Sequence, residues 1–122
     1  MAEVGKVWLS VFRGTKARLN RVILMVLSQH GPLTISELRR KIRAIKDYRY
    51  TRYSVIYRRV HALEKGDFIE VVGVREIQRK SPIYGLTPRG RLAILLDQIN
   101  LDHLLLSADR SKITSILKVL SE

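Results

Sequence analysis

Cysteine, acidic charge and long apolar runs are all scarce in this chain. It has no cysteine, which excludes disulfide bonds and thiolate metal sites. Its longest uninterrupted apolar run, residues 22–27, is far shorter than the ~20 residues that cross a bilayer. The first residues also lack the charged, apolar and small-residue order of a secretory signal. We therefore expect a cytoplasmic protein with no part in a membrane.

The sequence also lacks the groups of residues that are typical of catalytic sites. The three histidines, His30, His61 and His103, are far apart and show no spacing typical of metal ligands. The sequence also lacks a glycine-rich phosphate loop and a recognisable pair of acidic residues. We therefore expect neither an enzyme nor a bound metal or cofactor.

Positive charge is what the chain has in excess. Its 122 residues suit one domain, and 46% hydrophobic with 28% charged residues are ordinary for a folded globule. The 23 lysines and arginines outnumber the 11 acidic residues and give a net charge of +12. A field of this sign points to nucleic acid or an anionic membrane surface as the partner.

This charge is concentrated in one stretch. Residues 39–59 hold nine of the 23 basic residues and four of the five tyrosines, against one acid, Asp47. Residues 92–122 are close to neutral. An apolar stripe at helical spacing runs through the basic stretch, so one face can pack on a core while the other carries cations. The pattern indicates a pair of helices that lies on nucleic acid.

Three helices are predicted in the first half of the chain. Thr15 is expected to cap the first, which ends near His30 because a Gly-Pro pair follows. Residues 34–37 have the form of a capping box that opens the second helix. Thr51 is expected to cap the third, which runs to about Lys65. The side chains expected to face the core are Leu19, Val22, Ile23, Val26, Leu27, Ile35, Leu38, Ile42, Ile45, Ile56, Tyr57, Val60 and Leu63.

The hydrophobic period changes from 3.6 to 2 in the second half. Residues 68–74 and 83–87 are typical of two short strands, and the seven-residue connection over residues 75–81 includes three cations. They predict a hairpin with a basic tip. Thr87 and Pro88 then cap and start another helix, and apolar residues at helical spacing predict a last helix over residues 113–120.

Three helices, a two-stranded hairpin and further helix are the order of a winged helix-turn-helix, a mostly α member of the α+β class. Residues 15–90 would form this domain, after an N-terminal extension at 1–14 and before a C-terminal helical extension at 91–122. In this arrangement the second helix braces the DNA backbone and the third enters the major groove. The wing would reach flanking DNA.

Two runs carry a resemblance to a known family. Residues 57–69 read Tyr-Arg-Arg-Val-His-Ala-Leu-Glu-Lys-Gly-Asp-Phe-Ile, and residues 84–90 read Tyr-Gly-Leu-Thr-Pro-Arg-Gly. They resemble the PadR group of winged-helix transcription regulators, over about residues 17–100. The resemblance implies a regulator that binds DNA and dimerises. MarR-like and ArsR-like regulators share the Leu-Thr-x-x-Gly ending, and the basic, aromatic loop at 46–50 departs from the PadR pattern.

Base contacts are expected on the face of the third helix opposite its apolar stripe. Short side chains at the start of this face let the backbone come close to the groove. Arg58 can make a bidentate contact to guanine, and Val55 can meet a thymine methyl. The alternative is a solvated helix face with one arginine on it. The residues expected to face the bases are Thr51, Arg52, Ser54, Val55 and Arg58.

Other cations are expected to contact the phosphate backbone, which fixes register without reading sequence. The expected residues are Arg39, Arg40, Arg43, Lys46, Arg49, Tyr50 and Arg59, with Arg79 and Lys80 at the wing tip. Tyrosine hydroxyls can donate to phosphate in the same way. Alternatively, the rings pack on the turn and only their hydroxyl tips stay in water.

The near-neutral tail predicts a homodimer, because its amphipathic helix exceeds what a small three-helix core needs. The residues expected at the dimer interface are Leu104, Leu105, Ile113, Ile116, Leu117 and Leu120. The alternative is that both chain ends cover the domain's own core. No residue pattern marks a pocket for a small-molecule effector.

These observations together favour a cytoplasmic, nucleoid-associated transcription regulator that binds double-stranded DNA. Two other interpretations stay open. One is an architectural protein that coats DNA without reading its sequence. The other is a winged-helix interaction module of a replication or transcription machine, whose basic face meets an acidic protein or RNA.

Overall fold

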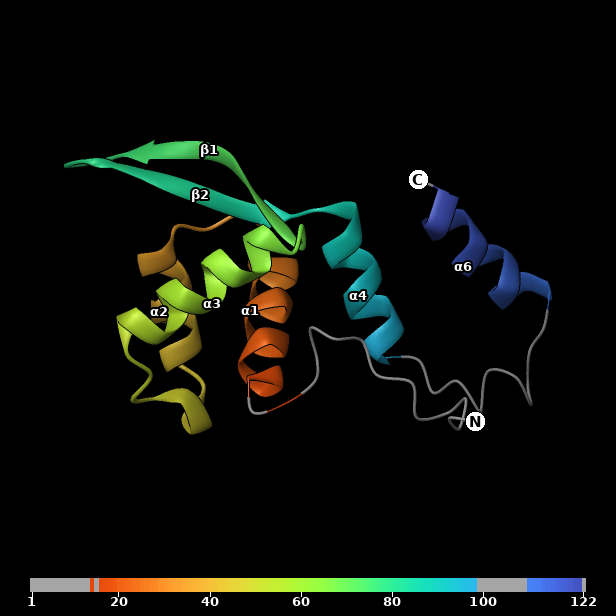
Figure 1. Ribbon diagram of the computed structural model, residues 1–122, viewed down its shortest axis with the longest axis horizontal. Coiled ribbons are helices and arrows are strands. Elements are labelled where there is room, and N and C mark those ends of the chain that lie inside the picture. Colours follow the sequence, from red (N-terminus) through yellow and green to blue (C-terminus); the bar gives the residue numbers. More distant parts are fainter. Residues whose placement is uncertain (1–13, 15, 99–109, 122) are drawn as a thin grey trace.

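The computed structural model describes Gly14, residues 16–98 and residues 110–121. The elements are α1 (Ala17–His30), α2 (Ile35–Arg43), the short 3-10 helix η3 (Lys46–Tyr48), α3 (Tyr53–Lys65), β1 (Ile69–Glu76), β2 (Lys80–Leu86), α4 (Pro88–Gln98) and α6 (Arg110–Ser121). The two strands form an antiparallel ribbon that projects beyond the helices (Figure 1). This is the predicted winged helix-turn-helix, with the ribbon as its wing.

The boundary between α1 and α2 follows from local chemistry. α1 stops at Gly31, whose φ of 78° is in the left-handed region and whose N–H donates to the Leu27 carbonyl at 3.0 Å. α2 opens with the predicted capping box. The Thr34 N–H donates to Glu37 Oε1 at 2.9 Å, and the Glu37 N–H donates to Thr34 Oγ1 at 3.2 Å. Both helix ends thus satisfy backbone groups that would otherwise face water.

The start of α3 differs from the prediction. Arg52, not Thr51, precedes the first turn, and it makes no side-chain cap bond. The Thr51 hydroxyl instead donates to the Tyr48 carbonyl at 2.8 Å and closes the turn that η3 begins. Thr51 was a good cap by residue type, but this local bond competes for its hydroxyl. The cap that Thr15 was expected to provide lies outside the described residues.

Two side chains assigned to the core are exposed. Tyr57 is 47% exposed, because it lies about 100° round the helix from the fully buried Ile56. Ile45 is 39% exposed, because α2 ends at Arg43 and the extended backbone at Ile45 leaves the helical face. The other core residues predicted on the first three helices are buried or half-buried.

The wing is longer than predicted. Glu76 pairs with Lys80, so only residues 77–79 remain for the turn, and the expected seven-residue connection is wrong. Polar residues interrupt the apolar alternation there, which hides the strand ends from a sequence pattern. Backbone hydrogen bonds hold the ladder regardless of exposed side chains. Most of the basic tip is therefore carried on paired strands.

A third segment also pairs with the wing. The Leu33 N–H donates to the Tyr84 carbonyl at 3.0 Å, and the Tyr84 N–H donates to the Leu33 carbonyl at 2.8 Å. The sequence did not predict this bridge, because a single paired residue leaves no alternating pattern. It fixes the base of β2 to the connection between α1 and α2.

The Leu-Thr-x-x-Gly run joins the wing to α4. The Thr87 hydroxyl donates to the Asp67 carbonyl at 2.5 Å and accepts the Gly90 N–H at 3.0 Å, so Thr87 is the cap that the sequence predicted. A Cβ on Gly90 would lie 2.1 Å from the Phe68 carbonyl oxygen. Position 90 must be glycine, because α4 passes so close to the Phe68 carbonyl, just before β1, that no side chain fits between them.

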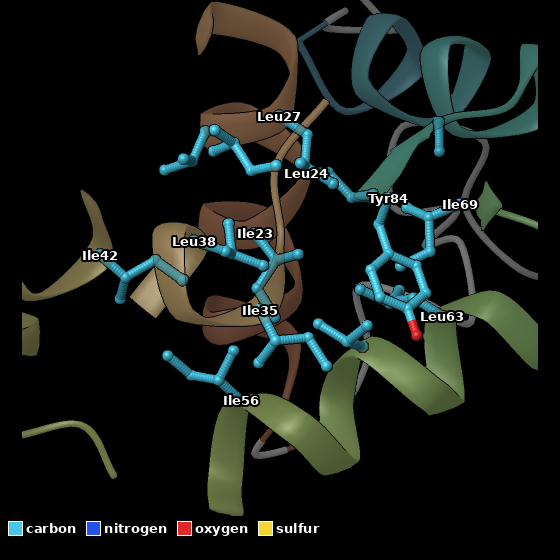
Figure 2. Packing of buried hydrophobic residues seen from close by; sticks show 14 of the residues in the cluster. Ile23, Leu24, Leu27, Ile35, Leu38, Ile42, Ile56, Leu63, Ile69 and Tyr84 are labelled. Carbon is cyan, nitrogen blue, oxygen red and sulfur yellow. The ribbon is translucent and has the colours of Figure 1, made fainter. Parts of the chain in front are cut away.

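One apolar core connects the helices to the wing. Labelled side chains of α1, α2 and α3 converge with Tyr84 of β2 in Figure 2. Ile23, Ile42 and Ile56, one from each helix, are fully buried. Across the described ranges, every helix is too short or too polar to cross a membrane.

Candidate nucleic-acid interface

Four arginines surround a cleft of about 520 Å³, where α2 faces the connection to α3. We call it the helix cleft. Its lining residues are Ser36, Arg39, Arg40, Arg43, Ala44, Arg49 and Tyr53. No acidic side chain lines it among the residues that the structure describes. The helix cleft therefore favours an anionic group.

Two of these arginines also hold the helix cleft together. Arg43 Nε donates to the Arg49 carbonyl at 2.8 Å, and Arg39 Nε donates to the Thr51 carbonyl at 3.4 Å. Both bonds join α2 to the chain just before α3. A guanidinium has five N–H donors, so these two side chains are oriented by one bond and keep other donors for an anion.

A second cleft, of about 260 Å³, separates the start of α2 from the wing. We call it the wing cleft, and its basic lining residues are Arg40, Arg75 and Arg79. Ser36 and Arg40 line both clefts. The two clefts therefore form one continuous cationic surface from the start of α3 to the wing tip.

Glu37 is the acidic residue that lines the wing cleft. Its Oε2 lies 3.0 Å from Arg75 Nε on β1, while its Oε1 accepts the Thr34 N–H of the capping box. The hydrogen bond from the Thr34 backbone lowers the pKa of Glu37, and the charge of Arg75 lowers it further against the opposing effect of burial. One carboxylate thus caps α2 and ties it to the wing.

The residues expected to face the bases lie at the start of α3. Arg52, Ser54 and Arg58 are exposed, and Val55 is half-buried. Arg58 Nε donates to the Ser54 carbonyl at 3.3 Å, so its side chain lies along the helix surface. Thr51 lies before the helix, is half-buried and has its hydroxyl bonded within the preceding turn.

The residues expected to contact the backbone divide into two groups. Those that line the clefts are Arg39, Arg40, Arg43, Arg49 and Arg79. Of the others, Lys46 is exposed, Arg59 is half-buried, and the exposed Lys80 has its Nζ 3.6 Å from Glu76 Oε1. Tyr50 is 83% exposed, so its ring does not pack on the turn, whereas Tyr48 packs against the core.

Sequence reasoning missed two residues of this surface. It placed Arg75 in the wing tip but did not foresee that Arg75 meets Glu37, because no local pattern reports a contact between a strand and a distant helix. Ser36 carried no signal beyond its place in the capping box. Both residues gain their position from the fold.

The residues expected at a dimer interface are only partly within the described structure. Leu104 and Leu105 lie outside the described residues. Ile113, Ile116 and Leu120 belong to α6, but their side chains are not among those described. Leu117 on α6 is 58% exposed.

A third cavity differs from the two clefts in character. It has a volume of about 310 Å³, lies between α1 and α4 and shares no lining residue with the clefts. Val22, Met25 and Ile94 line it, and the Arg21–Asp97 ion pair, at 2.9 Å, lies at its edge. Its lining fits apolar groups rather than phosphate. Within the described ranges, no cluster of three or more histidine or acidic side chains could hold a metal ion.

The fold and its cationic surface define a winged helix-turn-helix protein. Neither a protein-family model nor a curated protein sequence matches the chain. Among solved structures, it is similar to Staphylococcus aureus MarR in complex with salicylate and kanamycin, with a TM-score of 0.47 and 20% sequence identity. The likeness covers 83% of this chain and 66% of the MarR chain. The winged-helix assignment rests on the element order and strand pairing of this chain itself.

Proposed function

We propose that this protein is a transcription regulator that binds double-stranded DNA, with α3 in the major groove and the wing on flanking backbone. The continuous surface formed by the two clefts carries the proposal, because it holds six arginines and one ion-paired acid. An extended row of guanidinium groups suits the phosphates of a duplex. The run at residues 84–90 supports a PadR-like regulator, and a regulator that binds DNA would act at the nucleoid in the cytoplasm.

Phosphate binding is assigned to the arginines of both clefts. Arg39 and Arg43 are oriented by bonds to the chain before α3, which reduces the entropy lost when they bind an anion. Lys46, Arg49 and the exposed Tyr50 extend this surface along the connection to α3. Arg59, Arg79 and Lys80 are assigned to the backbone on the α3 and wing sides. If a dimer neutralises about eight phosphates, log affinity falls against log salt with a slope of about −7.

Sequence reading is assigned to the exposed face of α3. Ser54 is small, so the helix backbone can approach the floor of the groove there. Arg58, one turn later, suits the two acceptors of a guanine edge, and Val55 suits a thymine methyl. Arg52 and Thr51 lie at the N-terminal end of α3, the end of a recognition helix that lies nearest the bases.

A homodimer is part of the proposal. Leu117 exposes more than half of its surface on α6, where an apolar side chain gains free energy by burial against a second copy. Val119 on the same helix is 36% exposed. The remaining interface would come from Leu104, Leu105, Ile113, Ile116 and Leu120. A two-fold dimer places two copies of α3 in successive major grooves, about one helical turn of DNA apart.

Selection of bound duplexes from a random library at fixed salt tests the proposal. A dimeric regulator is expected to enrich a palindrome whose half-sites are separated by about one turn. An architectural protein would enrich nothing, and its affinities for selected and random duplexes would be nearly equal. An interaction module would retain no duplex, which would contradict the proposal outright.

A further inference from the structure

Three aromatic rings form a row along one side of α3. Tyr53, Tyr57 and His61 follow at intervals of four residues, so they stack one turn above another. The ring centroids of Tyr53 and Tyr57 are 6.2 Å apart, and those of Tyr57 and His61 are 4.3 Å apart. We call these three residues the aromatic row.

One end of the aromatic row is anchored and the other is open. The buried Tyr84 ring of β2, labelled in Figure 2, meets His61 edge-on at a centroid distance of 6.3 Å. At the open end, Tyr53 is 44% exposed and Tyr57 is 47% exposed. α3 already fills the core with Ile56, Val60 and Leu63, so the two tyrosines are not needed for packing.

The open end of the row meets the helix cleft. Tyr53 belongs to both, since its side chain lines the helix cleft together with four arginines. Cations that can bind a phosphate chain therefore lie directly beside rings on which flat groups can stack. This combination of a cationic groove and exposed aromatic side chains is the one that proteins use for single-stranded nucleic acid.

We infer that the helix cleft and the aromatic row bind an unpaired nucleic-acid strand. Arg39, Arg43 and Arg49 hold its phosphates, and Tyr53 and Tyr57 stack against its bases. In a duplex the base faces are covered by neighbouring base pairs, so only an unpaired segment can offer them to tyrosine rings. Every base has such a face, so this binding is tolerant of sequence. The site goes beyond duplex recognition, although it shares the same arginines.

Fluorescence anisotropy with labelled oligonucleotides of about 12 nucleotides tests the inference, since such strands match typical site sizes. An oligo-dT arm and an oligo-rU arm distinguish DNA from RNA as the source of the strand, and a labelled duplex runs in parallel. The variant Tyr53→Leu/Tyr57→Leu is expected to bind the single strand at least about tenfold more weakly, given the usual contribution of base stacking. Its duplex affinity should fall by a clearly smaller factor than its single-strand affinity, because a duplex offers no uncovered base face to the two rings.

The matched control is Tyr53→Phe/Tyr57→Phe, which keeps the rings and removes the hydroxyls. It should bind the single strand within about twofold of the original, because a phenyl ring stacks as well as a phenol. Unchanged single-strand affinity in the leucine variant would overturn the inference. An equal loss in the phenylalanine and leucine variants would overturn it too, because the contact would then be a hydroxyl bond to phosphate.

Cross-linking of the unaltered protein makes the test independent of how the variants fold. Ultraviolet irradiation with a bromouridine-substituted strand, followed by peptide mass spectrometry, should place cross-links on Tyr53 or Tyr57. Cross-links confined to other segments would contradict the site. The duplex arm reports separately on the proposed regulator, so either binding activity can fail while the other is retained.

Discussion

Gly90 shows at the scale of one residue how the joint between wing and α4 is built. The Phe68 carbonyl oxygen occupies the space that any side chain at position 90 would enter, at 2.1 Å from the Cβ position. Thr87 fixes the same joint with two hydrogen bonds to the backbone. The two residues of the Leu-Thr-x-x-Gly run therefore act on the same crossing of strand and helix.

Replacing Gly90 by alanine is expected to lower the free energy of unfolding by about 2 kcal/mol, because the backbone must move to admit the methyl group. Urea unfolding monitored by circular dichroism measures the change. Gly73→Ala is the matched control, since a Cβ there would meet only Ile83 Cδ1 at an ordinary 3.7 Å. Equal losses in the two variants would contradict the account of this joint.

Arg58 is the side chain on which base reading most depends. Arg58→Ala is expected to relax the preference at one base position by about 1–3 kcal/mol, because a bidentate contact to guanine is lost. Arg59 lies about 100° further round the helix and is assigned to the phosphate backbone, so Arg59→Ala should weaken the binding of all duplexes alike. Comparing each variant on the selected site and on single-base changes separates the two. An unchanged base preference in Arg58→Ala would remove this residue from the reading face.

At the scale of elements, Glu37 links α2 to the wing. Its carboxylate accepts the capping bond from Thr34 and pairs with Arg75 on β1. The Thr34 hydrogen bond and the Arg75 charge lower the pKa of Glu37 in the folded protein below its usual value of 4.5. The ionised carboxylate therefore stabilises the fold above that value, and its contribution is lost as pH falls through the lowered pKa.

Glu37→Gln is expected to lower stability by up to about 1 kcal/mol at neutral pH, because the ion pair with Arg75 is lost at a partly exposed site. The difference from the original protein should shrink as pH falls below 4.5. Thermal unfolding between neutral and acidic pH measures it. Glu76→Gln, which affects only an exposed pair with Lys80, is the control and should change little. A pH-independent difference for Glu37→Gln would show that the ion pair contributes nothing.

Elements also show what the sequence could predict and what it could not. The helices of the core, the capping box at residues 34–37 and the change of period at the wing are local signals, and the structure confirms them. The short wing turn was hidden because polar residues interrupt the apolar alternation at the strand ends. The Leu33–Tyr84 bridge and the Glu37–Arg75 pair depend on contacts between distant segments. Tyr57 was wrongly assigned to the core, because a helical wheel does not show whether a position at the edge of the apolar face is buried. The basic residues of the candidate interface were visible in composition, but the two clefts were not.

At the scale of the whole molecule, the regulator proposal requires two copies. The original protein is expected to sediment with twice the mass of one chain at micromolar concentration. Leu117→Arg should sediment as a monomer, because a buried charge would replace a buried apolar side chain at the interface. Lys118→Ala, at the exposed neighbouring position, should remain dimeric. A monomer in the original protein would contradict the dimer and its palindromic site.

The positions of the arginines distinguish a specific DNA-binding surface from a protein that binds DNA only because its net charge is positive. Arg40 lines both clefts and Arg43 lines the helix cleft, whereas Arg18 on α1 and Arg91 on α4 are exposed and line neither. Each pair carries the same charge. If DNA binding depended only on the long-range field of the protein, losing either pair would weaken duplex affinity equally. If it depends on direct phosphate contacts, losing Arg40 and Arg43 weakens it more.

The salt dependence of duplex affinity tests this difference most directly. Arg40→Ala/Arg43→Ala is expected to reduce the slope of log affinity against log salt by about 0.9 for each phosphate contact removed, and so by about 1.8 per protomer. Arg18→Ala/Arg91→Ala should leave the slope close to that of the original protein. Equal changes in the two double variants would contradict the claim that the clefts beside α2 are the surface that binds DNA.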